Sequence, residues 1–236
     1  MENSKFVKHK LPCKKCDSSD AVSLNNNGYA KCFSCDAYYD YETGEANITP
    51  IKSETTFLTS YTGSYSSLDD KGISENTARK FGVRTVRDNN NKIKQHIYPF
   101  FNGSEIVGTK TRYVDNKNFT CNGTFQGTGL FGEQLFRNTG GKYLTITEGE
   151  CDAMAVNELF QDKWATVSIK RWASSAVKDI RESIEFVESF DNVVLCFDND
   201  KAGREAARQV ARILKPGKAK IVNLPNGYKD ANEMLV

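Results

Sequence analysis

Residues 193–207 read VVLCFDNDKAGREAA, and this stretch joins an apolar run to two carboxylates, Asp198 and Asp200, one residue apart. A short continuous apolar run is typical of a strand that is buried on both faces. From Lys201 onward apolar residues recur at helical spacing, so we expect a helix directly after the acids. Because neighbouring anions repel each other, the turn between strand and helix needs a cation or water.

The same alternation of strand and helix continues on both sides of this stretch. We expect strands at 143–147, 165–169, 193–197 and 219–224, and helices at 151–160, 176–188 and 201–214. Strands that alternate with helices are typical of an α/β fold, in which helices cover the faces of a parallel sheet.

A third carboxylate, Glu148 in the segment TEGEC, follows another of these expected strands. The carboxyl ends of parallel strands meet at one edge of the sheet, where ligands bind. We therefore expect Glu148, Asp198 and Asp200 to gather there and to offer hard oxygen ligands to Mg²⁺. Helix capping is the alternative, because Asp200 could cap the next helix while Glu150 and Asp152 complement the dipole of another.

Four of the seven cysteines follow the spacing C-x2-C-x15-C-x2-C, namely Cys13, Cys16, Cys32 and Cys35. Two such pairs can close a tetrahedron of thiolates around one Zn²⁺ ion and leave no open position, so the ion would be structural. We expect a small zinc ribbon at 1–42, which needs the metal because so short a segment has almost no apolar core.

The side chains of this ribbon allow two interpretations. Tyr29, Lys31, Tyr38 and Tyr39 place rings and a cation near one small sheet, as a surface that stacks nucleobases would. A module of this size also exposes aromatic residues simply because it cannot bury them.

The middle of the chain differs from both ends. Residues 43–67 are rich in Ser, Thr, Gly and Asn and predict a flexible linker. A short helix is expected from a Ser74 cap to Phe81, ended by Gly82. Alternating segments at 83–87, 93–101 and 105–113 predict antiparallel strands. The core would then span 68–236, with an antiparallel α+β subdomain at 68–136 and the parallel-sheet α/β domain at 137–236.

The bulk composition sets few limits on function. The 236 residues carry a net charge of only +2, so composition alone does not indicate a nucleic-acid-binding protein. No stretch approaches the roughly 18 consecutive apolar residues of a membrane helix, and the N-terminus has no apolar targeting segment. We expect a cytoplasmic protein without a membrane partner.

Three segments together, TEGECDAMAV, VVLCFDNDKAGREAA and YKDANEML, resemble a TOPRIM domain. This metal-dependent fold is shared by bacterial-type primases, topoisomerases and some nucleases. With the ribbon in front and GTKTRYVDNKNF between them, the whole chain resembles the primase half of a bacteriophage primase-helicase. The resemblance implies a DNA primase of phage replication, acting in the host cytoplasm. Its ribbon would recognise a template sequence on single-stranded DNA, and its TOPRIM core would join ribonucleoside triphosphates into a short RNA primer.

The resemblance also implies roles for individual residues. Glu148, Asp198 and Asp200 would be catalytic and would hold Mg²⁺ or Mn²⁺, as two ions, with Asp230 at the rim of the site. Contacts to nucleotide or template phosphates would come from Lys110, Arg112, Lys117, Lys170, Arg171 and Lys229. For Lys110 and Arg112 the alternative is a solvated strand face. Template reading would fall to Tyr29, Lys31 and Tyr38.

Two departures from the family limit what can be transferred. Relatives have a Gly-containing loop where this chain has Lys170-Arg171-Trp172, although a cation beside an aromatic ring could serve bases or phosphates. The expected reading positions of the ribbon also differ, so the template triplet does not transfer.

Partners and rival functions follow from the same comparison. No GxxxxGK[ST] motif occurs, so a replicative helicase, either fused C-terminally or separate, would supply the unwinding. A DNA polymerase would take over the primer. One rival is a zinc-plus-TOPRIM recombination mediator that binds DNA without catalysis, although no helix-hairpin-helix segment precedes the ribbon. The other is a TOPRIM nuclease that cuts DNA with the same acids.

Overall fold

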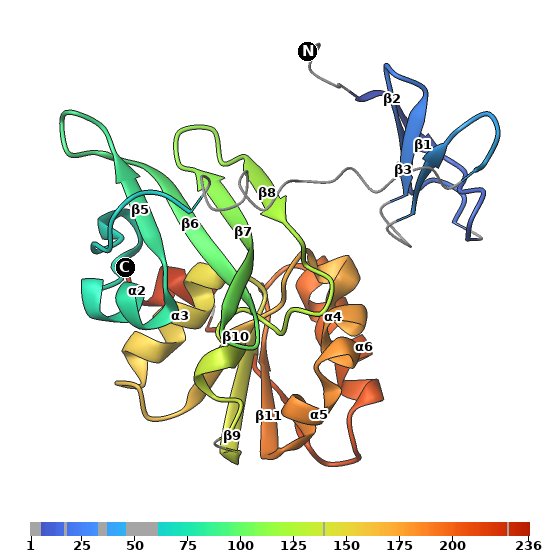
Figure 1. Cartoon of the computed structure of the whole chain (residues 1–236). Coiled ribbons are helices and arrows are strands. Elements are labelled where there is room, and N and C mark those ends of the chain that lie inside the picture. The colour runs from blue at the N-terminus through green and yellow to red at the C-terminus, as the bar shows by residue number, and fades with distance from the viewer. Residues whose placement is uncertain (1–5, 17, 33–36, 46–60, 139, 226) are drawn as a thin grey trace. The chain divides into compact units, whose positions relative to one another are not determined.

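The computed structural model describes residues 6–16, 18–32, 37–45, 61–138, 140–225 and 227–236 (Figure 1). The chain divides into two compact units, residues 1–53 and residues 54–236. Within the described ranges, no helix combines the length and apolar composition needed to cross a membrane.

The N-terminal unit contains an antiparallel sheet in the order β1-β2-β3-β4. Its strands are β1 Phe6–Leu11, β2 Val22–Asn25, β3 Tyr29–Cys32 and β4 Tyr38–Asp40. A turn at residues 25–28 joins β2 to β3, with the N–H of Gly28 bonded to the carbonyl of Asn25 and Gly28 at a φ of +84°. β1 escaped prediction because nearly all of its residues are exposed, which leaves no alternation of apolar and polar positions.

The buried centre of this unit is small. It consists of Val22, Ala30, Cys32 and Tyr39. A core of this size cannot offset the entropy of ordering the chain, so the unit needs a further source of stability.

The C-terminal unit contains the predicted parallel sheet, in the order β10-β9-β11-β12. Its strands are β9 Gly141–Thr147, β10 Ala165–Ser168, β11 Phe190–Cys196 and β12 Ala219–Ile221. Thr147 at the end of β9 pairs in register with Ser168 of β10 and with Cys196 of β11. These three strands therefore end at one level, and the residues that follow them leave from one edge.

The helices of this sheet are α3 Glu150–Leu159, α4 Ala176–Glu182, α5 Ile184–Glu188 and α6 Lys201–Ile213. The single helix expected at 176–188 is wrong, because the chain breaks at Ser183. At 100° per residue, a continuous helix with Ile180 and Val187 facing the sheet would turn Phe186 away from it. After the break, Phe186 and Val187 are both buried, and Phe186 packs edge-on against Phe190 at 5.3 Å between ring centroids.

An antiparallel sheet in the order β5-β6-β7-β8 precedes the parallel sheet and occupies the upper half of this unit in Figure 1. Its strands are β5 Arg84–Arg87, β6 Ile93–Asn102, β7 Glu105–Tyr113 and β8 Phe119–Gly123. β8 was not expected, because it is an edge strand with no buried residue and no alternating pattern. The helix α2 Glu75–Phe81 confirms the predicted caps, with Ser74 Oγ accepting from the N–H of Thr77 and Gly82 at a φ of +75°.

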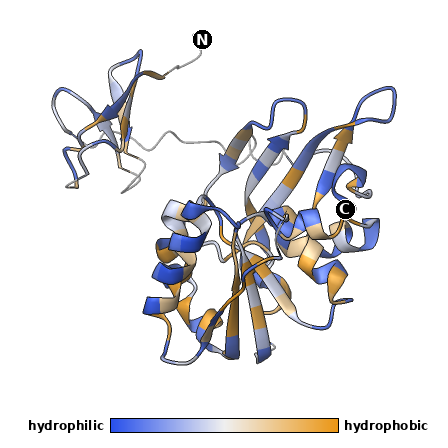
Figure 2. Ribbon diagram, turned by 180° about the vertical axis from the view of Figure 1, so that it is seen from behind, coloured by the Kyte–Doolittle hydropathy of each residue, from blue (hydrophilic) through white to orange (hydrophobic). Residues whose placement is uncertain are grey.

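Two large apolar clusters, and a small one of Val156, Cys196, Leu224 and Ala231, lie within the described part of this unit. One large cluster lies between the parallel sheet and helices α4, α5 and α6, and the other joins α2 and α3 to the antiparallel sheet. Figure 2 shows hydrophobic colour along the central strands and hydrophilic colour at the hairpin tips of the antiparallel sheet. α3 packs against β9 and β10 of the parallel sheet, and Glu150 and Cys151 in its first turn bond Lys110 and Tyr98 of the antiparallel sheet. The first turn of α3 is therefore positioned by both sheets.

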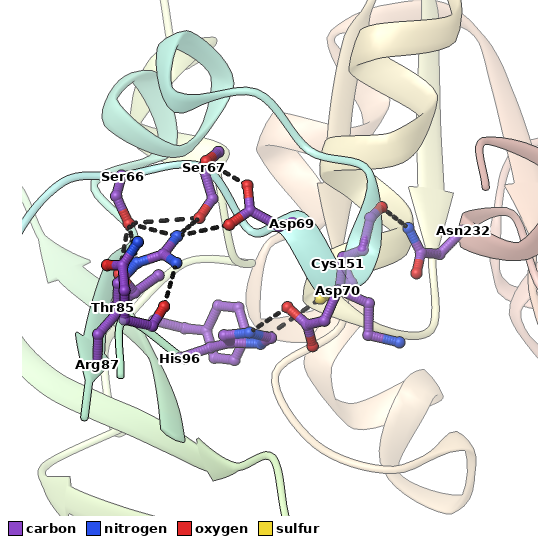
Figure 3. Close-up of polar contacts among 12 residues, drawn as sticks. Ser66, Ser67, Asp69, Asp70, Thr85, Arg87, His96, Cys151 and Asn232 are labelled. Atoms are coloured by element: carbon purple, nitrogen blue, oxygen red, sulfur yellow. Dashed lines mark hydrogen bonds and ion pairs between the residues drawn. The ribbon is translucent and has the colours of Figure 1, made fainter. Parts of the chain in front are cut away.

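Residues 61–67, which fall within the predicted linker 43–67, pack against the antiparallel sheet. Ser64 and Thr85 exchange backbone hydrogen bonds, and Ser66 Oγ lies 2.6 Å from Thr85 Oγ1. In Figure 3 the guanidinium of Arg87 donates to Ser66 Oγ, to the carbonyl of Ser67 and to Asp69 Oδ2. The hydroxyl-rich composition that predicted a linker instead supplies partners for β5, so the linker ends earlier than expected. Residues 46–60 lie outside the described ranges.

A buried polar chain ties the antiparallel sheet to α3 (Figure 3). His96 on β6 bonds Asp70 Oδ1 at 3.0 Å and the Tyr98 hydroxyl at 3.1 Å, and that hydroxyl lies 3.2 Å from Cys151 Sγ. Burial raises the pKa of Cys151 to about 12, so its sulfur stays a neutral thiol. This series of hydrogen bonds is therefore a structural bridge between the antiparallel sheet and α3. It does not make Cys151 a nucleophile that is activated by a neighbouring base.

Candidate metal sites

Three carboxylates leave the shared edge of the parallel sheet. Glu148 follows β9 directly, and Asp198 and Asp200 follow β11 within four residues. Gly203 in the first turn of α6 allows this arrangement, because a Cβ there would lie 2.3 Å from the carbonyl oxygen of Asp198. Only glycine lets the helix approach the turn that carries both aspartates so closely.

The acids are held in an environment that disfavours their charge. Burial, and then repulsion from Asp198 and Asp200, raises the pKa of Glu148 above its ordinary value. Burial also raises the pKa of Asp198, with Asp230 and Asp200 adding to the shift while Lys229 opposes it. The cluster is therefore prepared to accept positive charge.

Asp200 also caps α6, as the capping interpretation proposed. Its Oδ1 accepts from the N–H of Gly203 at 2.8 Å. One of its two carboxylate oxygens makes this bond, so capping and cation binding do not exclude each other.

A fourth acid, Asp152, extends the cluster, and sequence reasoning had assigned it to the dipole of a helix. It is buried on α3, and its Oδ1 accepts from the N–H of Asn232 at 2.9 Å. Burial, with repulsion from Asp230, raises its pKa to about 7. The segment KDANE at 229–233 thus returns to α3 and brings Asp230 near enough to repel both Asp152 and Asp198. The sequence did not predict that Asp152 joins the acids, because no local pattern indicates that residues 229–233 fold back onto α3.

The cations around the acids differ in exposure. Lys229 Nζ lies 3.2 Å from Asp198 Oδ2, with 58% of its side chain exposed. Lys110, on β7, is buried and donates to Glu150 Oε1 at 2.8 Å, so the alternative of a solvated face is wrong for Lys110. Arg112 shares the face of Lys110, because both cations lie over the ring of Phe119.

Two further predicted cations lie apart from the acids. Lys117 is exposed in the turn between β7 and β8, at a φ of +57°. Arg171 is half-buried beside Asp179, with 4.0 Å between Nη1 and Oδ1.

Lys170 does not occupy the position that was expected for it. It is 1% exposed, and its ammonium donates to the carbonyl of Thr128 at 3.0 Å and to a carboxylate oxygen of Glu182. This placement contradicts the expected phosphate contact, because the cation is sealed inside the unit and already paired.

The carboxylates fit a hard divalent cation. Glu148 Oε2 is buried and has no hydrogen-bond partner, a costly arrangement for an acceptor unless a ligand completes it. All the candidate donors are carboxylate oxygens, which Mg²⁺ and Mn²⁺ prefer. Among the described residues, the carboxylate oxygens of Glu148, Asp198 and Asp200 do not all lie within 4.8 Å of one another. The sulfurs of Cys13, Cys16 and Cys32 do lie within that distance. Mutual repulsion accounts for the spread of the carboxylates.

A second candidate centre lies in the N-terminal unit. The sulfurs of Cys13, Cys16 and Cys32 lie within 4.8 Å of one another. Burial raises the pKa of Cys13, but hydrogen bonds from the N–H of Lys15 and from the Tyr39 hydroxyl outweigh it and lower the value to about 6. A low thiol pKa favours the thiolate that Zn²⁺ requires. The fourth predicted ligand, Cys35, lies outside the described residues.

The predicted reading residues of the ribbon lie close together. The rings of Tyr29 and Tyr38 stack at 5.6 Å with 8° between their planes, and Lys31 on β3 pairs in register with Tyr38 on β4. Tyr39 differs from them, because it is fully buried and donates its hydroxyl toward Cys13 Sγ. Tyr39 therefore belongs to the cysteine cluster and not to the half-buried pair of stacked rings.

Comparisons with known proteins agree with this geometry. A Toprim-like family model matches residues 145–235. The DNA helicase/primase of Enterobacteria phage T3 is 35% identical over 242 residues, which cover 98% of this chain but 42% of the phage protein. The chain thus spans less than half the length of that curated relative.

Two solved structures are also similar. The crystal structure of the primase fragment of the bacteriophage T7 primase-helicase has a TM-score of 0.67 and 32% identity, and covers 97% of this chain and 94% of that fragment. A structure of bacteriophage T7 lagging-strand DNA polymerase with primase domains bound to an RNA/DNA hybrid and dTTP contains a match with a TM-score of 0.64 and 36% identity. It covers 72% of this chain and 84% of that chain.

Proposed function

The chain belongs to the family of bacteriophage primase-helicases, aligning with their primase part, and from this premise we propose that it is a DNA primase. It would copy single-stranded DNA into short RNA primers for phage replication, as a template-directed nucleotidyl transferase. The observation that carries the proposal is the convergence of Glu148, Asp198 and Asp200 at the edge where β9 and β11 end together.

These three carboxylates are the proposed ligands of Mg²⁺ or Mn²⁺, as two ions, with Asp230 and Asp152 at the rim. A bound divalent cation would lower the pKa of the attacking ribose 3′-hydroxyl and offset the charge of the triphosphate. Glu148 is the best candidate to face the nucleophile, because its buried Oε2 lacks a partner.

Cations of the chain would hold the phosphates. Lys229 is mostly exposed and already lies beside Asp198, so it can exchange this partner for a phosphate once the cluster is neutralised. Arg112, Lys117 and Arg171 are proposed to contact nucleotide or template phosphates. Lys110 is proposed to act beside them, with its ammonium held between Glu150 and the ring of Phe119.

The N-terminal unit is proposed to bind one structural Zn²⁺ through Cys13, Cys16, Cys32 and Cys35. Its half-buried pair of stacked rings, Tyr29 and Tyr38, supports a role in reading template bases, because bases stack on such surfaces.

The proposed partners follow from the relatives. The T3 protein is a helicase/primase, and the T7 structure holds primase domains together with a DNA polymerase. We therefore propose a replicative helicase, fused or separate, and a DNA polymerase that receives the primer, all acting in the host cytoplasm.

The proposal is tested by incubating the zinc-loaded protein with single-stranded DNA templates of defined sequence, Mg²⁺ and labelled ribonucleotides. Short RNA products that depend on template sequence are expected. Cleaved DNA without RNA would instead assign a nuclease. Binding of DNA with neither product would assign a recombination mediator.

A further inference from the structure

The loop after β10 carries one buried and one exposed side chain that are separated by a single residue, Lys170 and Trp172. Lys170 is sealed inside by its bonds to Thr128 and Glu182, and its backbone N–H donates to Asp179 Oδ2 at 2.9 Å. Trp172, two residues later, is 61% exposed. The buried lysine therefore anchors a loop that presents a large aromatic side chain to solvent.

Trp172 is held in place by contacts from the antiparallel sheet. Its ring packs edge-to-face with Phe119 of β8, at 5.9 Å between centroids and 84° between planes. Lys110 Nζ lies 4.9 Å from the Phe119 centroid and 5.6 Å from the Trp172 centroid. The ring is thus fixed along one side and open on the rest of its surface.

This aromatic pair adjoins the acidic edge of the parallel sheet. The N–H of Ile169 bonds the carbonyl of Thr147, which extends the pairing of β10 with β9 up to the loop itself. The ammonium of Lys110 contacts both rings and also Glu150, two residues after Glu148. One side chain therefore links the aromatic pair to Glu150, in the first turn of the helix that follows Glu148.

We propose that Trp172 and Phe119 form a stacking platform for the nucleobase of a ribonucleoside triphosphate whose phosphates are held at the acidic edge. The inference rests on the proposed primase function and names the residues that would hold the base. The base and the triphosphate of one nucleotide are joined through a single ribose, so they lie close together. The two rings would lie at a matching distance from the acidic edge, because Lys110 contacts both rings and also Glu150. A template base is the other possible source, and the experiment separates the two.

The energetics favour such a platform. Stacking of a base on an aromatic ring changes affinity by about fivefold to a hundredfold, and it tolerates any base because every base has a π face. Lys110 contacts both rings, and Lys170 anchors the loop that carries Trp172. Because the platform is already held in place, nucleotide binding would cost little conformational entropy.

The first test uses the fluorescence of Trp172 in the intact 236-residue chain. The chain has two tryptophans, so Trp164→Phe leaves Trp172 as the reporter. With Mg²⁺ and no template, ATP should quench its emission, whereas inorganic tripolyphosphate, which has no base, should not. The reciprocal Trp172→Phe protein, which retains Trp164, should show no quenching by ATP. Equal quenching by tripolyphosphate, or quenching by single-stranded DNA but not by ATP, would overturn the proposal.

The second test measures primer synthesis. Trp172→Ala should raise the KM for nucleotides about fivefold or more with little change in kcat, and Trp172→Phe should recover most of the loss. Phe160→Ala removes a similarly exposed ring, 51% exposed at the end of α3, and should leave KM unchanged. If the wild type makes primers and Trp172→Ala keeps the wild-type KM, the platform is refuted while the primase function stands. If the wild type makes no RNA, the primase function fails, and the fluorescence test still decides whether Trp172 binds a base.

Discussion

Asp200 shows at the scale of one residue how two roles share a side chain. Its Oδ1 closes the first turn of α6, and the same carboxylate raises the pKa of Glu148 by repulsion. Because capping needs an acceptor oxygen while cation binding needs negative charge, a substitution can separate the two roles.

Asp200→Asn should therefore keep the cap and lose catalysis. Asparagine caps helices as well as aspartate does, so the melting temperature should stay near that of the wild type. Primer synthesis should fall by about two orders of magnitude or more, as expected when a charged ligand is lost. Asp200→Ala, which also removes the cap, should cost about 1 kcal/mol of stability in addition. Full activity in Asp200→Asn would reduce the residue to a helix cap.

Asp152 makes stability depend on pH. Its pKa of about 7 lies above the ordinary value of 3.8, so the folded state holds the proton more tightly than the unfolded chain does. Its stabilising contribution is complete below about pH 4 and is lost as pH rises toward 7.

Asp152→Asn should remove part of this pH dependence, because asparagine cannot ionise but keeps an Oδ1 acceptor for the N–H of Asn232. Without divalent cations, the variant should be more stable than the wild type above pH 7, by at most about 4 kcal/mol. The pKa values of Glu148 and Asp198 are raised in the same direction, so some dependence should remain. Urea unfolding at pH 5 and pH 8 measures the difference. Parallel pH profiles of the two proteins would contradict the assignment.

At the scale of elements, the loop between β10 and α4 depends on one buried cation. Lys170 joins this loop to the carbonyl of Thr128 and to Glu182 on α4, so three segments share one ammonium. Removing a buried partner leaves the remaining groups without compensation.

Lys170→Met should lower the free energy of unfolding of the C-terminal unit by about 2–3 kcal/mol. This loss is at the low end of what removing one partner of a buried ion pair costs, because Glu182 is 36% exposed and water can solvate it in the variant. Lys142→Met, at an exposed position on β9, is the matched control and should change stability by less than about 0.5 kcal/mol. Urea denaturation compares the two variants. Equal stabilities would show that the buried lysine does not hold the loop.

At the scale of the whole molecule, the chain consists of two units with different sources of stability. The C-terminal unit has extended apolar clusters, whereas the described part of the N-terminal unit buries a core of four residues, one of which is Cys32. Loss of metal from the ribbon should therefore leave the core folded.

Cys32→Ser tests this independence. The variant should release zinc and lose template-directed initiation, yet it should still extend a supplied primer, because the acids lie in the other unit. Zinc content, initiation and extension are measured on the same preparation. Equal loss of initiation and extension would argue against a recognition role for the ribbon.

Local patterns in the sequence were sufficient for the parallel sheet, the strand-end acids, both caps of α2 and the cluster of Cys13, Cys16 and Cys32. Each of these follows from the periodicity of neighbouring residues or from turn chemistry, which acts over a few positions. The same patterns misplaced residues 61–67 and the break at Ser183, where distant segments set the outcome.

Only the tertiary structure decided which charges are buried and what they meet. Lys170 faces inward and Trp172 outward, although the two are separated by a single residue, because Thr128 and Glu182 surround the first and Phe119 supports the second. Asp152 joins the acids because Asn232 closes over it from 80 residues away. Burial and pairing depend on which remote segments pack together, and no local period of the sequence encodes that.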